Sequence, residues 1–326
     1  MIKVKKLSKR FDSYERSEGF IEALKALVVR KKKVFEALKG ISFDIPKGEI
    51  VGFLGPNGAG KSTTIKIISG IVYPDSGDVD VMGFCPWEDR KKYVSNIGVV
   101  FGQKSQLIWD LPAIDAFHFN KTIYKINDEI FQKQLDRLTN LLDIKEVMKR
   151  PARQLSLGER MRCEFAMALL HDPPLVFLDE PTIGLDIFAK ETIREFIKQM
   201  NKEGKTFIVT SHDLEDIENL CHRLIIINHG KIVFDDSIEK LKVGRRKHIS
   251  VSYYNAIDRK KLEKIPEIKI KKQYSDRSFM LEVDTSKKYL DGIIKEIRLG
   301  KRIKDIEIRE PPVTEIIKKL YRKETI

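Results

Sequence analysis

Cysteine is scarce in this sequence, and long apolar runs are missing. The 326 residues contain three cysteines, Cys85, Cys163 and Cys221, and their wide spacing fits no metal-ligand pattern. We interpret them as buried, reduced thiols, which excludes a fold held together by disulfides. No run of about 18 apolar residues occurs, and the polar start does not resemble a signal peptide. We therefore expect a protein that does not itself cross a membrane.

Positive charge is in excess. Lysine and arginine number 61 against 48 aspartates and glutamates, which gives a formal net charge of +13. Such a basic chain is expected to meet an acidic partner, either a nucleotide, a nucleic acid or an anionic lipid. Hydrophobic residues make up 42% of the chain, enough for a full core, and the length favours about two domains.

Short apolar runs outline the first domain, over residues 1–240. They lie at 49–54, 175–178, 207–210 and 224–228, with helical patterns between them. Strands that alternate with helices indicate a mostly parallel sheet covered on both faces. The tripeptide Asn228-His229-Gly230, followed by another apolar run, predicts a hairpin that closes this domain.

Residues 13–33 form an insertion near the start of this domain. Apolar residues recur there at helical spacing, and the segment ends in Arg30-Lys31-Lys32-Lys33, so we predict a basic amphipathic helix. It could pack on its own domain or dock to a membrane surface or membrane partner. Membrane recruitment that survives deletion of the segment would exclude docking.

The pattern changes after residue 243. Residues 248–254, 267–273, 278–284 and 302–309 read as strands, and residues 258–264 and 286–299 read as helices. The order β-α-β-β-α-β is that of a ferredoxin-like unit. We therefore predict a small α+β domain over residues 245–326, without a chemical motif, that serves regulation or dimer contact.

The stretch Gly55–Ser62 matches the phosphate-loop pattern G-x-x-x-x-G-K-[ST], with a strand before it and a helix after it. Glycines let successive backbone N–H groups point inward, which forms an anion site at a helix N-terminus. Lys61 adds a positive charge at the phosphates, and Ser62 offers a hydroxyl to Mg²⁺. The predicted contacts to a nucleoside triphosphate are Asn57, Gly58, Ala59, Gly60, Lys61, Ser62 and Thr63.

Two adjacent carboxylates follow an apolar strand at residues 175–178. Neighbouring side chains on a strand point in different directions, so the two acids can have separate roles. We predict that Asp179 helps to hold Mg²⁺ and that Glu180 is the general base that activates water.

A third motif is Leu155-Ser156-Leu157-Gly158-Glu159, ahead of a helical stretch. Taken locally, Ser156 and Glu159 form a capping box. A capped helix N-terminus also attracts anions, since its dipole and free N–H groups point outward.

Together these motifs resemble the ATP-binding cassette (ABC) family over about residues 1–240. Gly55–Ser62 resembles its Walker A motif, residues 155–159 its signature sequence, and residues 175–180 its Walker B motif with the catalytic glutamate. Gln103 is similar to the Q-loop glutamine, Gly184-Leu185-Asp186 to the D-loop, and His212 to the switch histidine. The fold implied is an α/β P-loop NTPase of the ABC type with a helical subdomain near residues 104–170.

The resemblance implies a head-to-tail dimer with two ATP molecules at its interface. The second ATP-binding subunit would in the simplest case be another copy of this chain. Ser156, Gly158 and Asp186 would then contact the nucleotide held by the partner. His212 would hold the γ-phosphate and the water, and Gln103 would sense Mg²⁺ and connect to the membrane partner.

This sequence departs from the family pattern at three places. Leu157 stands where glycine is usual, and Glu159 where glutamine is usual. Leucine is tolerable there if its φ is negative, and Glu159 is expected to turn back into the capping interaction. The family stacks an aromatic residue on adenine near the first strand, and Phe11 is our choice, with Phe35 and Tyr14 as alternatives.

The function implied is that of an ATPase subunit of an ABC transporter, cytoplasmic and peripheral on the inner face of the cell membrane. A separate transmembrane permease would carry the substrate, with export favoured over import. The alternative is a soluble ABC ATPase that acts on nucleic acid or ribosomes, which the basic charge permits. One cassette without sustained heptads disfavours that alternative, and Glu180 with His212 disfavours a cassette that only binds ATP.

Overall fold

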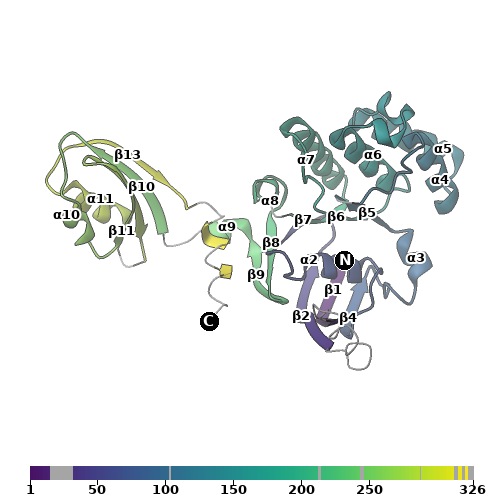
Figure 1. Cartoon of the computed structure of the whole chain (residues 1–326), viewed down its shortest axis with the longest axis horizontal. Helices are drawn as coiled ribbons and strands as arrows, with labels where there is room; N and C mark the ends of the chain where they lie inside the picture. Colours follow the sequence, from purple (N-terminus) through teal and green to yellow (C-terminus); the bar gives the residue numbers. More distant parts are fainter. Residues whose placement is uncertain are drawn as a thin grey trace, which may run out of the picture. The chain divides into compact units, whose positions relative to one another are not determined.

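The computed structural model describes residues 1–14, 32–102, 104–211, 214–242, 246–286, 288–311, 315–317 and 320–321. The chain divides into two compact units, Met1–Asp236 and Ser237–Ile326 (Figure 1). Among the described residues, no helix combines the length and the apolar character that crossing a bilayer requires.

A six-stranded sheet forms the centre of the first unit, in the order β5-β6-β7-β3-β8-β9. The pairs β5–β6, β6–β7, β7–β3 and β3–β8 are all parallel. Every residue of β3 and β7 is buried, as expected for continuous apolar runs covered on both faces. The strands are β3 (Ile50–Leu54), β5 (Ile97–Phe101), β6 (Leu175–Asp179), β7 (Thr206–Thr210), β8 (Arg223–Asn228) and β9 (Lys231–Ser237).

The predicted hairpin at the end of this unit is confirmed. Strands β8 and β9 are neighbours in the sheet and are separated only by His229 and Gly230. Both residues have positive φ, 46° and 78°, as a tight two-residue hairpin turn requires.

A second sheet of this unit has the order β2-β1-β4, formed by β1 (Ile2–Tyr14), β2 (Lys32–Ile45) and β4 (Ser76–Val81), with antiparallel pairs. It shares one hydrophobic core with the parallel sheet, where Phe43 and Phe53 pack edge to face at 5.2 Å between ring centroids. The predicted insertion at residues 13–33 begins and ends in these strands, since Tyr14 pairs with Lys32. The rest of that segment lies outside the described residues.

Helices occupy residues 104–170, as predicted from the sequence. They are α4 (Ala113–Tyr124), α5 (Asp128–Leu141) and α6 (Leu157–Leu169). Around the parallel sheet lie α2 (Lys61–Ile68), α3 (Arg90–Val94), α7 (Ile187–Lys202) and α8 (Leu214–Leu220). Helix α2 contacts β6, α7 contacts β7, and α8 contacts β3. Each of these helices comes after a strand of the parallel sheet, since α2 follows β3, α7 follows β6 and α8 follows β7.

The second unit has the predicted β-α-β-β-α-β order after a short first helix, α9 (Ile238–Lys242). Its sheet order is β11-β12-β10-β13, and all three pairs are antiparallel. One face of the sheet supplies the core with alternate residues such as Ile249, Val251 and Leu281, which pack with Ile293 and Ile297 of α11. The remaining elements are β10 (Arg246–Tyr253), α10 (Arg259–Glu263), β11 (Ile268–Ser275), β12 (Ser278–Asp284), α11 (Leu290–Arg298) and β13 (Ile303–Arg309).

Candidate active site

The phosphate-loop residues line an open hollow of about 600 Å³ at the carboxyl end of β3. Gly60 is the N-cap of α2 and has a φ of 113°, a backbone conformation that favours glycine. The first turn of α2 contains no acidic residue, so the helix dipole stays available to an anion. Lining the hollow are Phe35, Pro56, Asn57, Gly58, Ala59, Gly60, Lys61, Ser62, Thr63, Glu180 and Ile183.

The side chain of Lys61 is hydrogen-bonded to the backbone of the phosphate loop. Its ammonium donates to the carbonyl oxygens of Gly55 at 2.7 Å and Pro56 at 3.3 Å. Burial lowers the pKa of Lys61, and the charges of Glu180 and Asp179 partly counteract this. A cation that is desolvated in this way gains from a nearby anion, so a phosphate group fits the position.

Asp179 lies between two hydroxyl groups. Ser62 donates to Asp179 Oδ1 over 3.1 Å, and Thr210 donates to the same oxygen over 2.6 Å. Residues from the ends of β6 and β7 and the start of α2 therefore meet at one edge of the sheet. Sequence analysis predicted Asp179 and Ser62 together, whereas Thr210 gave no signal beyond its place at a strand end.

Glu180 has an unusual backbone, with a φ of 56°. The left-handed region costs a non-glycine residue about 1–3 kcal/mol and persists only where neighbours enforce it. The Glu180 N–H donates to both the carbonyl and the hydroxyl oxygen of Thr210, at 3.1 and 3.0 Å. Gly102 lies so close that an added Cβ would be 1.9 Å from the Glu180 carbonyl oxygen. The backbone that carries this carboxylate beside the phosphate loop is thus held from several sides.

Gln103 and His212 lie outside the described residues. The segment after Gln103 is fixed by Glu164, a buried residue of α6 that sequence analysis missed. Glu164 Oε1 accepts from the Ser105 hydroxyl at 2.5 Å and from the backbone N–H of Gln106 at 2.8 Å. Burial raises the pKa of Glu164, and these hydrogen bonds partly offset the effect. The available sequence signal was a lone acid within the otherwise apolar stretch 163–170.

The signature residues form the predicted capping box at the start of α6. The Glu159 N–H donates to Ser156 Oγ at 3.2 Å, and the Ser156 N–H donates to Glu159 Oε2 at 2.8 Å. The expectation that Glu159 turns back into the cap is confirmed, and Arg150 also pairs with it. Leu157 is not among the described residues with positive φ, so leucine is tolerated there.

Gly158 and Asp186 are neighbours in the structure. A Cβ added to Gly158 would lie 2.9 Å from the Ala189 methyl and 3.9 Å from Asp186 Oδ2. Asp186 caps α7, accepting from the Ala189 N–H at 2.9 Å. Ser156, Gly158 and Asp186 do not line the hollow at the phosphate loop. One subunit therefore presents them as a separate surface.

Phe11 and Phe35 are cross-strand partners in the β1–β2 ladder, and directly paired residues share one face of a sheet. Of these two aromatic residues, Phe35 lines the hollow and Phe11 does not. The side chain of Phe11 is 40% exposed, and the ammonium of Lys9 lies 5.5 Å from its ring centroid. The side chain of Tyr14 is outside the described residues.

The second unit contains a cluster of His248, Glu282 and Glu315, whose ligand atoms lie within 4.8 Å of one another. The Lys271 ammonium lies 2.8 Å from Glu282 and 2.5 Å from Glu315. Arg246 also pairs with Glu282 at 2.8 Å. These cations neutralise the carboxylates, so the cluster is an ion-pair network.

Comparisons with known proteins agree with this geometry. The family model described as ABC transporter matches residues 38–183. The ABC transporter ATP-binding protein NatA of Bacillus subtilis is 34% identical over 216 residues, which cover 66% of this chain and 88% of NatA. The linearmycin resistance ATP-binding protein LnrL of the same organism is 39% identical over 196 residues, covering 60% of this chain and 63% of LnrL.

A solved structure gives the same fold. The ATP-binding cassette MJ0796, a dimer in a post-hydrolysis state bound to ADP and Pi, is 27% identical with a TM-score of 0.61. The match covers 73% of this chain and 99% of that one. The α/β P-loop fold with its helical part therefore agrees with both the sequence motifs and the known structures.

Proposed function

This chain belongs to the ATP-binding subunits of ABC transporters and is an ATPase, and from that premise we propose that it drives export through a separate membrane permease. The observation that supports ATP hydrolysis, the energy source of this proposal, most directly is the convergence of Lys61, Asp179 and Glu180 at one edge of the parallel sheet. Ligands of open α/β folds bind outside the carboxyl ends of the strands, where these residues lie.

In the proposed mechanism, each residue has one task. The N–H groups of the phosphate loop and the Lys61 ammonium bind the phosphates and stabilise the charge that develops on them. Glu180 accepts the proton of the attacking water as general base. Its constrained backbone keeps the carboxylate in place without help from the substrate. Gln103 and His212 would complete the site from the loops after β5 and β7.

Mg²⁺ is the metal that we propose for this site. Ser62 and Asp179 offer adjacent hard oxygen donors, and their hydrogen bond already joins them over 3.1 Å. Oxygen ligands of this kind suit Mg²⁺, which supplies charge neutralisation on the phosphates. Gln103 is the third proposed ligand residue.

A second copy of this chain is proposed to face the nucleotide through Ser156, Gly158 and Asp186. These residues form a surface apart from the phosphate loop, and MJ0796 is a dimer. Next to Asp186, the side chains of Ile187 and Phe188 are 80% and 81% exposed. Two adjacent exposed apolar residues are typical of a contact surface, so they support the dimer.

The permease is proposed to dock on the helical part of the first unit. Large apolar side chains are exposed there, among them Trp109 at 54% and Phe119 at 60%. A nearby hollow is lined by Ile123 and Tyr124 together with basic residues, including Arg90 and Lys125. Such a surface fits an amphipathic segment of a membrane protein, and docking would hold the chain at the inner face of the membrane.

Native purification tests the transporter assignment. We expect the chain to co-purify with a polypeptide that has transmembrane helices, and Trp109→Ala to weaken this association. Tyr289→Ala is the matched control, since Tyr289 is 87% exposed in the second unit. Binding of nucleic acid that falls with salt, without any membrane partner, would instead favour the soluble ATPase.

Export is supported by the resistance function in the name of LnrL. Cells that carry Glu180→Gln in place of the native chain should become more sensitive to a panel of toxic compounds. Loss of growth on a nutrient, with unchanged sensitivity, would indicate import.

A further inference from the structure

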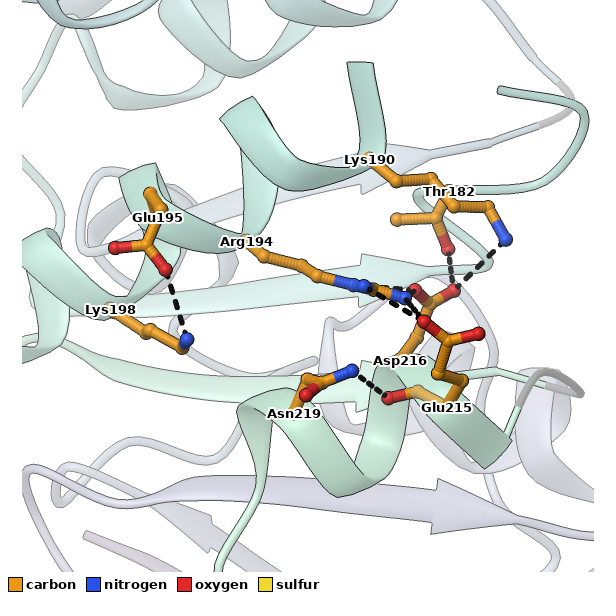
Figure 2. Close-up of polar contacts among 8 residues, drawn as sticks. All are labelled: Thr182, Lys190, Arg194, Glu195, Lys198, Glu215, Asp216 and Asn219. Carbon is orange, nitrogen blue, oxygen red and sulfur yellow. Dashed lines mark hydrogen bonds and ion pairs between the residues drawn. The ribbon is translucent and has the colours of Figure 1, made fainter. Parts of the chain in front are cut away.

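A buried carboxylate next to the active site joins three segments of the first unit. Asp216 of α8 is only 1% exposed. Its Oδ2 accepts the Thr182 hydroxyl at 2.5 Å, and its Oδ1 accepts Arg194 Nε at 2.8 Å. The ammonium of Lys190 lies 3.8 Å from Oδ2. Figure 2 shows Thr182, Lys190 and Arg194 converging on the Asp216 side chain.

The partners of Asp216 come from functionally distinct segments. Thr182 follows Glu180 by two residues, in the turn that leads toward Asp186. Lys190 and Arg194 lie on α7, the helix that Asp186 caps. A single carboxylate therefore ties the turn after the general base, and the helix after the D-loop, to α8.

Glu180 needs support on both sides because its φ is positive. On its N-terminal side, Thr210 accepts the Glu180 N–H, and the carbonyl oxygen of the preceding Asp179 accepts the Gly102 N–H at 2.8 Å. On its C-terminal side, the Ile183 N–H donates to the Glu180 carbonyl oxygen at 3.3 Å. The hydrogen bond from Thr182 to Asp216 anchors the C-terminal side of the turn to helix α8.

We propose that Asp216 is a positioning residue for ATP hydrolysis, which holds the turn after Glu180 through Thr182 and links it to α7 through Arg194. The inference rests on the proposed role of Glu180 as general base. Asp216 does not line the nucleotide hollow. It acts on the rate of hydrolysis through the placement of Glu180, while nucleotide binding depends on the phosphate loop.

Two isosteric variants and one control separate positioning from general stability. Thr182→Val removes the hydroxyl donor and leaves the pair of Asp216 with Arg194, and Asp216→Asn removes the charge. Lys198→Gln is the control, because the ion pair of Lys198 with Glu195 lies on the same helix, at 2.9 Å and exposed, without reaching Asp216 (Figure 2). Circular dichroism and thermal unfolding verify that each variant is folded.

The expected result is a split between turnover and binding. Thr182→Val and Asp216→Asn lower kcat by about 10- to 100-fold, the range for a misplaced catalytic group. The affinity for a fluorescent ATP analogue stays within about twofold, since the phosphate loop is intact. Lys198→Gln changes neither quantity. A folded Thr182→Val variant with normal kcat overturns the proposal even if Asp216→Asn does not fold.

The decisive measurement repeats both substitutions in a Glu180→Gln background, with single-turnover hydrolysis as the readout. If Asp216 acts through Glu180, the second substitution lowers the residual rate no further, because residues that act as a unit are not additive. An equal loss in both backgrounds shows a merely structural role and refutes the inference. Near-normal hydrolysis by Glu180→Gln alone refutes instead the proposed role of Glu180, so the two failures are distinguishable.

Discussion

The two units of the chain bury polar groups very differently. Among the described residues, all the buried polar and charged side chains except Glu282 lie in the first unit. Lys61, Thr182, Thr210 and Asp216 lie around the ends of the parallel strands. In the second unit, Glu282 is neutralised by Arg246 and Lys271.

Burial of a polar group costs free energy unless partners compensate it. A fold tolerates many such groups in one place when that place has a chemical task, which is why buried titratable groups indicate active sites. The second unit alternates apolar and polar residues, and its buried carboxylate Glu282 lies in ion pairs with Arg246 and Lys271. The difference indicates that the first unit contains the residues that hydrolyse ATP. Variants in both units test this conclusion, in order of decreasing expected effect.

The largest effect is expected for Lys61→Ala. The ammonium is the buried cation of the phosphate loop, and loss of such a group lowers turnover by about 1000-fold. Steady-state ATPase measurements check this, with Lys66→Ala on the same helix as the control. Retention of more than about a tenth of the native rate would contradict the role of Lys61.

Glu180→Gln comes next, with a loss of at least about 100-fold in turnover, the low end for a lost general base. Binding of ATP should persist, because the amide occupies the same space without accepting the proton. We therefore expect an ATP-bound dimer that size-exclusion chromatography detects. A variant that hydrolyses ATP normally would show that another group is the base.

A smaller effect is expected at the aromatic pair Phe11 and Phe35. Stacking of a base on an aromatic ring contributes about 1–3 kcal/mol, so alanine at the residue that stacks should weaken ATP binding by about 5- to 150-fold. Because Phe35 lines the hollow, we expect Phe35→Ala to weaken binding more than Phe11→Ala. Equilibrium titrations of ATP binding with both variants measure the two effects. The reverse order would show that adenine stacks on Phe11.

Glu164→Gln should alter the pH dependence of stability. Burial raises the pKa of Glu164 in the folded protein, so the folded state binds the proton more tightly than the unfolded state. The contribution of Glu164 to the free energy of unfolding is complete below the ordinary pKa of glutamate. It is lost as pH rises through the raised pKa of the folded protein. Glutamine stays neutral, so the variant should gain stability relative to the native protein as pH rises from about 4 to 8.

Urea unfolding of both proteins across that range measures the difference. A difference in free energy of unfolding that stays constant with pH would show that Glu164 titrates alike in both states.

The smallest effect on catalysis is expected from Glu282→Ala in the second unit. Removing this carboxylate leaves Arg246 and Lys271 without their shared partner, at a cost of about 1–2 kcal/mol in stability. Thermal unfolding should reveal the loss, whereas ATP turnover should stay within about twofold. A large fall in turnover would assign the second unit a direct part in the catalytic cycle.

The sequence alone determined the two folds and most of the site. Continuous apolar runs predicted the parallel strands, and the motifs at Gly55–Ser62 and at Asp179-Glu180 predicted which residues meet. The β-α-β-β-α-β order of the second unit followed from alternation. These features are local, because periodicity and short motifs report on neighbouring residues.

Only the tertiary structure decided which distant residues support the site. Glu164 and Asp216 each accept hydrogen bonds from segments about 20 to 60 residues away. Phe35, 24 positions beyond Phe11, reaches the same face because two antiparallel strands pair there. Such contacts arise when strands and helices pack. The position of an acidic residue in the sequence therefore does not predict which hydrogen-bond donors will surround it in the folded protein.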